Sequence, residues 1–162
     1  ELALREERID LALLGQPCPI LKRTYEIRPI RKVPMAVALP ESHCLAHHKA
    51  VDLNEFSQDT FLSLHEKHLP GRPLLLRALF DKAGISPTVA LKVDGLSELL
   101  GQVGTGGGVA LIPSDAHTLP HAGVCFVALR CPKTMLVSSA VWRKERGPSE
   151  LLQEFVDELA AE

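Results

Sequence analysis

The chain has 162 residues, the length of one domain or of two small lobes built from a single chain. Hydrophobic residues make up 46% of it and charged residues 23%, which excludes a disordered or fibrous protein. The formal net charge of -2 supplies no broad positive field for phosphates, so we do not expect this chain itself to bind nucleic acid.

The cysteines favour a reduced setting. They stand far apart and form no C-x-x-C pair, so a disulfide framework is not indicated and a cytoplasmic protein is expected. No run approaches the roughly 18 apolar residues of a membrane span, and the charged start ELALREERID does not look like a signal peptide. Because the chain lacks a starting Met, we expect a fragment of a longer protein, cut at its N-terminal side.

Short apolar runs alternate with segments of helical period, which predicts an α/β fold with a largely parallel sheet. The predicted strands are 9–14, 35–39, 60–64, 88–93, 109–112, 124–129 and 135–142. The proline- and charge-rich stretch 17–34 separates the first two strands, and residues 130–133 separate the last two. Both stretches are interpreted either as surface connections or as crossings between two lobes.

Three segments carry apolar residues at helical spacing. The first helix is entered through Gly71 and Pro73 and ends at Gly84. Its apolar stripe consists of Leu75, Leu76, Leu79, Phe80 and Ala83. In the second helix the stripe consists of Leu96, Leu99, Leu100 and Val103, and glycines from Gly104 onward are expected to end it with a left-handed turn.

The third predicted helix lies at the end of the sequence. Gly147, Pro148 and Glu150 suit its first turn, because proline is tolerated there and a carboxylate complements the helix dipole. We expect this helix to bury five side chains, Leu151, Leu152, Phe155, Val156 and Leu159.

The motifs typical of catalysis are missing or incomplete. The glycine run in VGTGGGVALIPSD (103–115) lacks the Lys and Ser/Thr of a phosphate-binding P-loop, and it stands between a helix and a strand, the reverse of a dinucleotide fingerprint. His65, Glu66 and His68 lack the four-residue histidine spacing of a zinc protease. We interpret the cluster His43, Cys44, His47 and His48 as a surface turn rather than a soft-metal site.

One group of residues does point to a ligand. After the strand 60–64 the chain supplies His65, Lys67, His68 and Arg72, followed by a helix whose free N–H groups face the same strand end. A small carboxylate is therefore a candidate ligand here, and a solvated basic loop is the alternative. No G-x-S-x-G nucleophile motif occurs, and Ser114 stands alone at a strand end.

Six segments, in this order and spacing, together resemble the effector-binding domain of LysR-type transcriptional regulators. They are ERIDLALLG (7–15), MAVALPESHCLA (35–46), VDLNEFSQDTFLSL (51–64), FDKAGISP (80–87), VDGLSELLGQVGTGGGVALIP (93–113) and AVWRKE (140–145). The resemblance implies a fold like that of type 2 periplasmic binding proteins, with two α/β lobes and a cleft between them. By that analogy residues 1–31 and 134–162 form an incomplete first lobe, and residues 32–133 form the second.

Carried over position by position, the family's cleft lining falls on nine residues. They are Gly15, Gln16, Leu64, His65, Gly95, Leu96, Pro113, Ser114 and Asp115. The sequence begins after the family's first strand, first helix and second strand, so the resemblance implies that part of the cleft is missing from this chain. The resemblance implies that the family's DNA-binding domain is also missing from this chain.

The resemblance implies a sensor that binds a small effector, one with a carboxylate, and performs no chemistry. No metal or cofactor and no membrane contact is expected. The expected partners are the effector, further copies of the chain in a homodimer or homotetramer, and promoter DNA held only by an absent winged helix-turn-helix. The alternative is a solute-binding protein of a transport system. It would share the fold, but the unpatterned cysteines and the charged start disfavour it.

Overall fold

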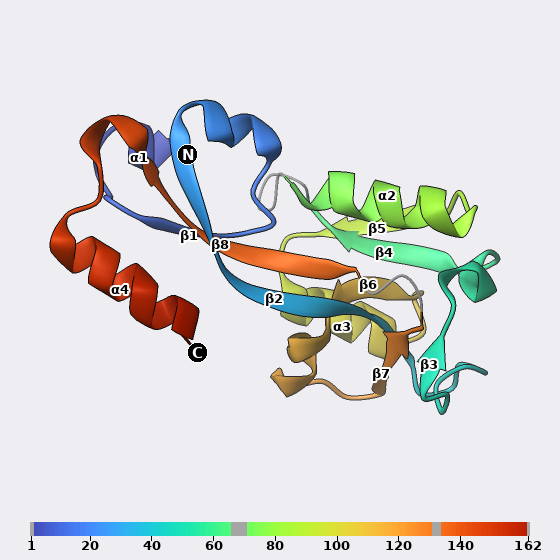
Figure 1. Ribbon diagram of the computed structural model, residues 1–162. Coiled ribbons are helices and arrows are strands. Elements are labelled where there is room, and N and C mark those ends of the chain that lie inside the picture. Colours follow the sequence, from blue (N-terminus) through green and yellow to red (C-terminus); the bar gives the residue numbers. More distant parts are fainter. Residues whose placement is uncertain (1, 66–70, 131–133, 162) are drawn as a thin grey trace.

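The computed structural model describes residues 2–65, 71–130 and 134–161 (Figure 1). In these ranges the helices are α1 (Leu2–Arg5), α2 (Arg72–Ala83), α3 (Leu96–Gly104) and α4 (Glu150–Ala161). The strands are β1 (Ala12–Gly15), β2 (Tyr25–Pro40), β3 (Ala50–Val51), β4 (Thr60–Leu64), β5 (Thr88–Val93), β6 (Ala110–Pro113), β7 (Val124–Leu129) and β8 (Met135–Arg143). Short 3-10 turns include η1 (Pro19–Arg23), η2 (Leu53–Phe56), η4 (Ser114–Thr118) and η5 (Lys144–Arg146).

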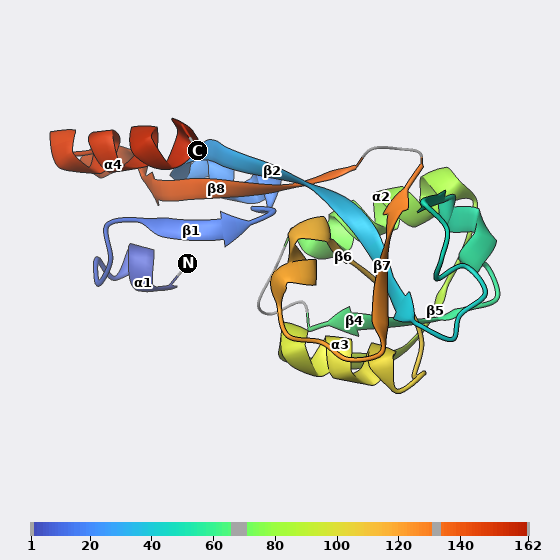
Figure 2. The ribbon, with the colours of Figure 1, turned by 90° about the horizontal axis from the view of Figure 1, so that it is seen from below.

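Two long strands, β2 and β8, connect the two halves of the molecule (Figures 1 and 2). Their antiparallel ladder runs from the pair Tyr25↔Arg143 to the pair Pro34↔Met135. Beyond it, β2 continues between β6 and β7. We call α1, β1, η1 and α4 with the adjoining ends of β2 and β8 the terminal part. The central part comprises β3 to β7, α2 and α3 with the other end of β2.

The prediction of a largely parallel sheet is wrong for the described strands. β2 is antiparallel to β6, β7 and β8, and β1 is antiparallel to β8. Parallel pairs join β4 to β5 and β3 to β7, and a parallel bridge joins Phe61 to Val109. Residues 35–39 form a continuous apolar run, the pattern typical of parallel strands, because both faces of this strand are buried. Val37 belongs to one core cluster and Ala38 to another.

The stretch 17–34 is not only a connection, because residues 25–34 form the first half of β2. Pro29 and Pro34 made a strand look improbable there, since proline cannot donate to a ladder. Within the described pairings this half of β2 has one neighbour, β8, so the prolines do not interrupt a second ladder. The second stretch was residues 130–133, of which residues 131–133 lie outside the described residues.

The three predicted helices are confirmed. α2 begins at Arg72 and is capped by Gly84 in the left-handed conformation, at φ 69°. α3 ends at Gly104, but the left-handed turn lies two residues later, at Gly106 with φ 84°. In the described ranges, no helix has the length and hydrophobicity that crossing a bilayer requires.

The prediction that α4 buries five apolar side chains is wrong. Val156 is buried, whereas Leu151 is 76% exposed and Phe155 is 48% exposed. Leu152 and Leu159 are half-buried. The reason is that α4 packs along one stripe only, where Val156 meets Ala140 and Trp142 of β8.

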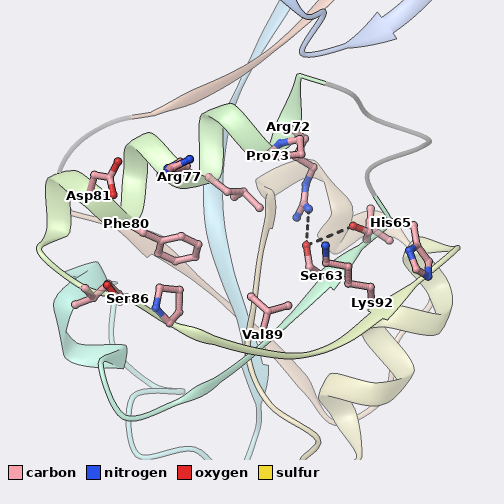
Figure 3. A pocket seen from close by; sticks show the side chains of 14 residues that line it. Ser63, His65, Arg72, Pro73, Arg77, Phe80, Asp81, Ser86, Val89 and Lys92 are labelled. Carbon is pink, nitrogen blue, oxygen red and sulfur yellow. Dashed lines mark hydrogen bonds between the residues drawn. The ribbon is translucent and has the colours of Figure 1, made fainter.

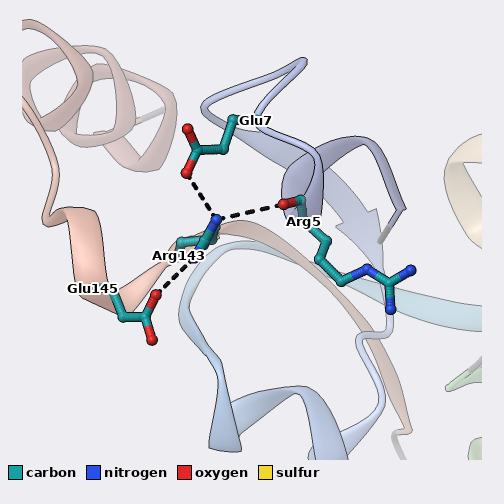
Figure 4. A network of polar contacts seen from close by, with 4 residues as sticks. All are labelled: Arg5, Glu7, Arg143 and Glu145. Carbon is teal, nitrogen blue, oxygen red and sulfur yellow. Dashed lines mark hydrogen bonds and ion pairs between the residues drawn. The ribbon is translucent and has the colours of Figure 1, made fainter.

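Polar contacts also hold the terminal part together (Figure 4). Arg143 in β8 pairs with Glu7 at 2.9 Å and with Glu145 at 2.6 Å, and its Nη1 donates to the carbonyl oxygen of Arg5. The hydrogen bond to Glu145, and then the nearby negative charges, raise the pKa of Arg143. Arg28 of β2 pairs with Asp157 of α4. These contacts tie both ends of the chain to the β2–β8 ladder.

Candidate functional site

Five of the nine predicted lining residues lie at one edge of the central part. β4 is parallel to β5 and bridges in parallel to the start of β6, so the carboxyl ends of the three strands face the same way. Leu64 ends β4, and the His65 N–H donates to the Val93 carbonyl at the end of β5 (2.9 Å). Gly95 and Leu96 begin α3 directly after β5, and Pro113 ends β6. Ligands of open α/β sheets commonly bind at such an edge.

Ser114 and Asp115 open η4 directly after β6. The Ser114 carbonyl oxygen lies 2.7 Å from Nδ1 of His117, so that nitrogen carries the proton. The Asp115 carboxylate reaches across to β2, where its Oδ2 lies 3.6 Å from Nη1 of Arg31. Asp115 therefore contacts the strand that leads into the terminal part.

Gly15 and Gln16 lie at the end of β1, where Gly15 pairs with Ser138 of β8. Gln16 has a left-handed backbone at φ 53°, and both its N–H and its Oε1 hydrogen-bond the backbone of Val137, at 2.7 and 3.1 Å. A Cβ on Gly71 would come within 1.9 Å of the Gln16 carbonyl oxygen. The end of β1 therefore packs against the start of α2, and the Gln16 amide is already used by β8.

The predicted residues are distributed over different cavities. Gly15 lines a cavity of about 520 Å³ that also contacts α4, which we call the β1–α4 cavity. Leu64 and His65 line one of about 400 Å³ between α2 and β5, the α2–β5 cavity. Ser114 lines a third, also about 520 Å³, formed by residues of β2, β7, η4 and the start of β8. The structure thus groups the strand ends but does not gather all nine residues around one space.

The α2–β5 cavity contains part of the basic group expected from the sequence (Figure 3). Arg72, at the first turn of α2, is 3% exposed and donates to Ser63 Oγ (3.0 Å) and to the Leu111 carbonyl oxygen (2.6 Å). Burial lowers the pKa of Arg72 to about 10, so the guanidinium stays charged at neutral pH. His65 lines the same cavity, whereas Lys67 and His68 lie outside the described residues.

The histidine- and cysteine-rich turn serves the fold. His43 Nε2 lies 3.1 Å from Asp59, its Nδ1 accepts from the Leu45 N–H, and its ring stacks on Phe56. Among the described residues, no group of three or more side chains is arranged to hold a metal ion. Glu66 and His68, weighed above as a zinc motif, lie outside the described residues.

Sequence reasoning missed Arg31. It lies in the stretch interpreted as a connection, and nothing in its immediate neighbours marks it as part of a site. In the structure it lines the β1–α4 cavity and pairs with Asp115. The sequence carried only an indirect signal for Arg31. Pro29 and Pro34 flank the apolar and basic residues 30–33, and in the structure this part of β2 pairs with the part of β8 that contains Ser138 and Ser139.

Comparison with known proteins gives consistent matches. The family model described as LysR substrate binding domain matches residues 1–162. The chain is 26% identical over 145 residues to the transcriptional regulator BudR of Raoultella terrigena, covering 88% of this chain and 49% of BudR. It is 24% identical to the activator HcaR of Escherichia coli, covering 96% of this chain and 52% of HcaR. The chain therefore spans about half the length of these relatives.

Solved structures show the same fold. The regulator HinK of Pseudomonas aeruginosa, of the LysR family, superposes with a TM-score of 0.84 at 25% identity, covering 99% of this chain and 55% of HinK. The effector-binding domain of QuiR, in complex with shikimate, gives 0.81 at 22% identity, covering 98% of this chain and 73% of that domain. The expected α/β fold of the type 2 periplasmic-binding-protein kind is thus confirmed. The chain belongs to the LysR substrate binding domain family.

Proposed function

We propose that this chain is the effector-sensing part of a LysR-type transcriptional regulator and that it binds a small metabolite bearing a carboxylate, without transforming it. The observation that carries the proposal is the basic strand-end edge of the central part. There His65 and the buried, charged Arg72 lie beside the aligned ends of β4 and β5. Two proteins of the same fold support the ligand class, because the shikimate bound by QuiR and the benzoate bound by the effector-binding domain of BenM are both carboxylates.

In this proposal, residues 1–31 and 134–162 form the first lobe, residues 32–133 form the second, and the effector binds between them. Its binding surface is the set of predicted lining residues. The separate core clusters of the terminal and central parts support the division, as does the β2–β8 ladder that joins them. The effector acts by a population shift, favouring one lobe arrangement by as much as it binds that arrangement better.

Self-association and DNA binding belong to the proposal as well. In the described part of the chain β5 pairs with β4 alone, and its Val89 and Leu91 are 43% and 37% exposed. Leu74 on the neighbouring α2 is 55% exposed. A second copy covering this apolar edge would give the expected homodimer or homotetramer. We propose that the whole protein works in the cytoplasm and contacts promoter DNA through a winged helix-turn-helix outside this sequence.

The regulator relatives favour this function over a transport solute-binding protein. A titration with carboxylic acids tests it, starting with shikimate and benzoate and measured by calorimetry and native mass spectrometry. We expect saturable binding with no turnover of the ligand.

The His65→Ala variant examines the proposed edge directly. Loss of the ring that lines the α2–β5 cavity is expected to weaken binding of an anionic effector about tenfold, roughly what one hydrogen bond to a charged group contributes. His48→Ala is the matched control, because His48 is an exposed histidine of the distant turn that follows β2. Unchanged affinity of His65→Ala would remove His65 from the site. Consumption of the ligand would contradict the sensor function.

A further inference from the structure

The β1–α4 cavity has an unequal distribution of charge. Its eight lining residues come from β1, β2, β8 and α4, and they are Leu13, Leu14, Gly15, Ile30, Arg31, Ser138, Ser139 and Leu159. Among these eight, Arg31 is the one charged residue; four are aliphatic, two are serines and one is glycine. Such a lining suits a ligand that is mostly apolar and carries a single negative group.

The β2–β8 ladder is interrupted next to Arg31. The pairing passes from Pro29↔Ser139 directly to Arg31↔Ser138, so Ile30 has no partner in the register. The unpaired Ile30 and its neighbour Arg31 both line the cavity. Bulges of this kind redirect side chains and are common beside binding sites.

The present partner of Arg31 is easily exchanged. The Arg31–Asp115 distance is 3.6 Å, and the two side chains are 66% and 41% exposed. Ion pairs of this exposure contribute about 0 to 1 kcal/mol, because water screens them and two flexible side chains must be held in place. A carboxylate inside the cavity would be shielded from water on several sides and could accept two parallel N–H donors from the guanidinium.

We propose that Arg31 recognises the carboxylate of a small apolar acid in the β1–α4 cavity, and that the bound acid takes the guanidinium from Asp115. Toward an acid in this cavity, Asp115 acts through Arg31 rather than by direct contact, since a carboxylate repels an anion and Asp115 is not among the lining residues. The exchange also removes a contact between the terminal part, where the cavity lies, and η4 of the central part. The inference rests on the proposed sensing function and places an acid beside Gly15, one of the predicted lining residues, in a cavity separate from the one that His65 lines.

Calorimetry with 3-phenylpropionate and its neutral amide, 3-phenylpropionamide, tests the inference on the 162-residue chain. We expect the wild type to bind the acid about tenfold more tightly than the amide. Arg31→Gln is expected to lose this preference by weakening the acid alone. Asp115→Asn is expected to bind the acid a few-fold more tightly, because the competing carboxylate is gone. Amide NMR shifts at Gly15 and Ser138 locate the ligand.

Arg28→Gln is the matched control, because Arg28 lies on the same strand, pairs with Asp157 of α4 and does not line the cavity. It is expected to keep wild-type affinity, and circular dichroism confirms that each variant is folded. Wild-type affinity of Arg31→Gln for the acid, or an Asp115→Asn variant that binds more weakly, overturns the inference while leaving the sensing function intact. A wild type that binds neither this acid nor any acid of the earlier panel overturns both.

Discussion

The central and terminal parts of the molecule bury their apolar residues to different extents. In the central part, Phe56, Phe61 and Leu79 are each no more than 2% exposed and belong to a cluster with 14 buried members. The terminal part has clusters of four and three buried residues, while Leu13 of β1 and Phe155 of α4 remain 58% and 48% exposed. The central part is thus closed around its own core. The terminal part buries fewer apolar side chains, and the β2–β8 ladder and the ion pairs of Arg28 and Arg143 connect its elements.

The largest expected effect is a loss of stability on truncating a core side chain of the central part, compared with the same change in the terminal part. Phe61→Ala is expected to lower the free energy of unfolding by about 3 to 5 kcal/mol, because the ring is buried against Phe80 and leaves a cavity. Phe155→Ala is the counterpart in the terminal part and is expected to cost about 1 kcal/mol or less, since half of that side chain is already in water. Urea titration followed by circular dichroism measures both. Equal losses would contradict the difference between the cores.

A smaller effect is expected where the two parts touch. Gly71→Ala places a methyl group 1.9 Å from the Gln16 carbonyl oxygen, so the backbone must shift. A loss of about 1 to 3 kcal/mol is expected, as for other overpacked sites. Gly101→Ala in α3 is the control. It meets no atom within 4 Å and is expected to gain about 0.5 to 1 kcal/mol from helix propensity. If Gly71→Ala is as stable as the wild type, the end of β1 does not pack on α2.

The smallest effects compare two serines. Ser63→Ala removes an acceptor of the buried Arg72 and is expected to cost about 1 to 2 kcal/mol. Ser139→Ala in β8 removes a buried hydroxyl that has no hydrogen-bond partner within the described residues, so it is expected to be neutral or to gain up to about 1 kcal/mol. Thermal unfolding of the two variants shows the sign of each change. A Ser139→Ala variant that is clearly less stable would mean that this hydroxyl does have a partner.

The sequence predicted regular elements well where hydrophobic period and burial agree. Residues 60–64, 88–93 and 124–129 are strands with the expected bounds, and α2 ends at Gly84 as its glycine indicated. Residues 25–34 were missed, because a strand with one ladder tolerates prolines and charges that usually end a strand. α4 was predicted from the same period as α2, but periodicity does not reveal how much surface is available to cover a helix.

The candidate site was predictable in part. Leu64, His65, Gly95 and Pro113 were named because the family resemblance carries the cleft lining onto these positions, and they lie at one edge of the central part. Arg31 was not named, because the cavity that it lines is formed by residues of β1, β2, β8 and α4, which no single segment of the sequence reveals. The Arg31–Asp115 contact joins residues that lie 84 positions apart in the sequence, so the neighbours of either residue do not reveal it.

The β2–β8 ladder has a mechanical consequence. Two hydrogen-bonded strands behave as a ribbon, so the halves that they join can twist and bend relative to each other but cannot swing freely like domains on a single flexible tether. The compliant position of such a ribbon is the place where a pair is missing, at Ile30. Bending there would move α4 relative to the central part while the other pairs of the ladder stay in place.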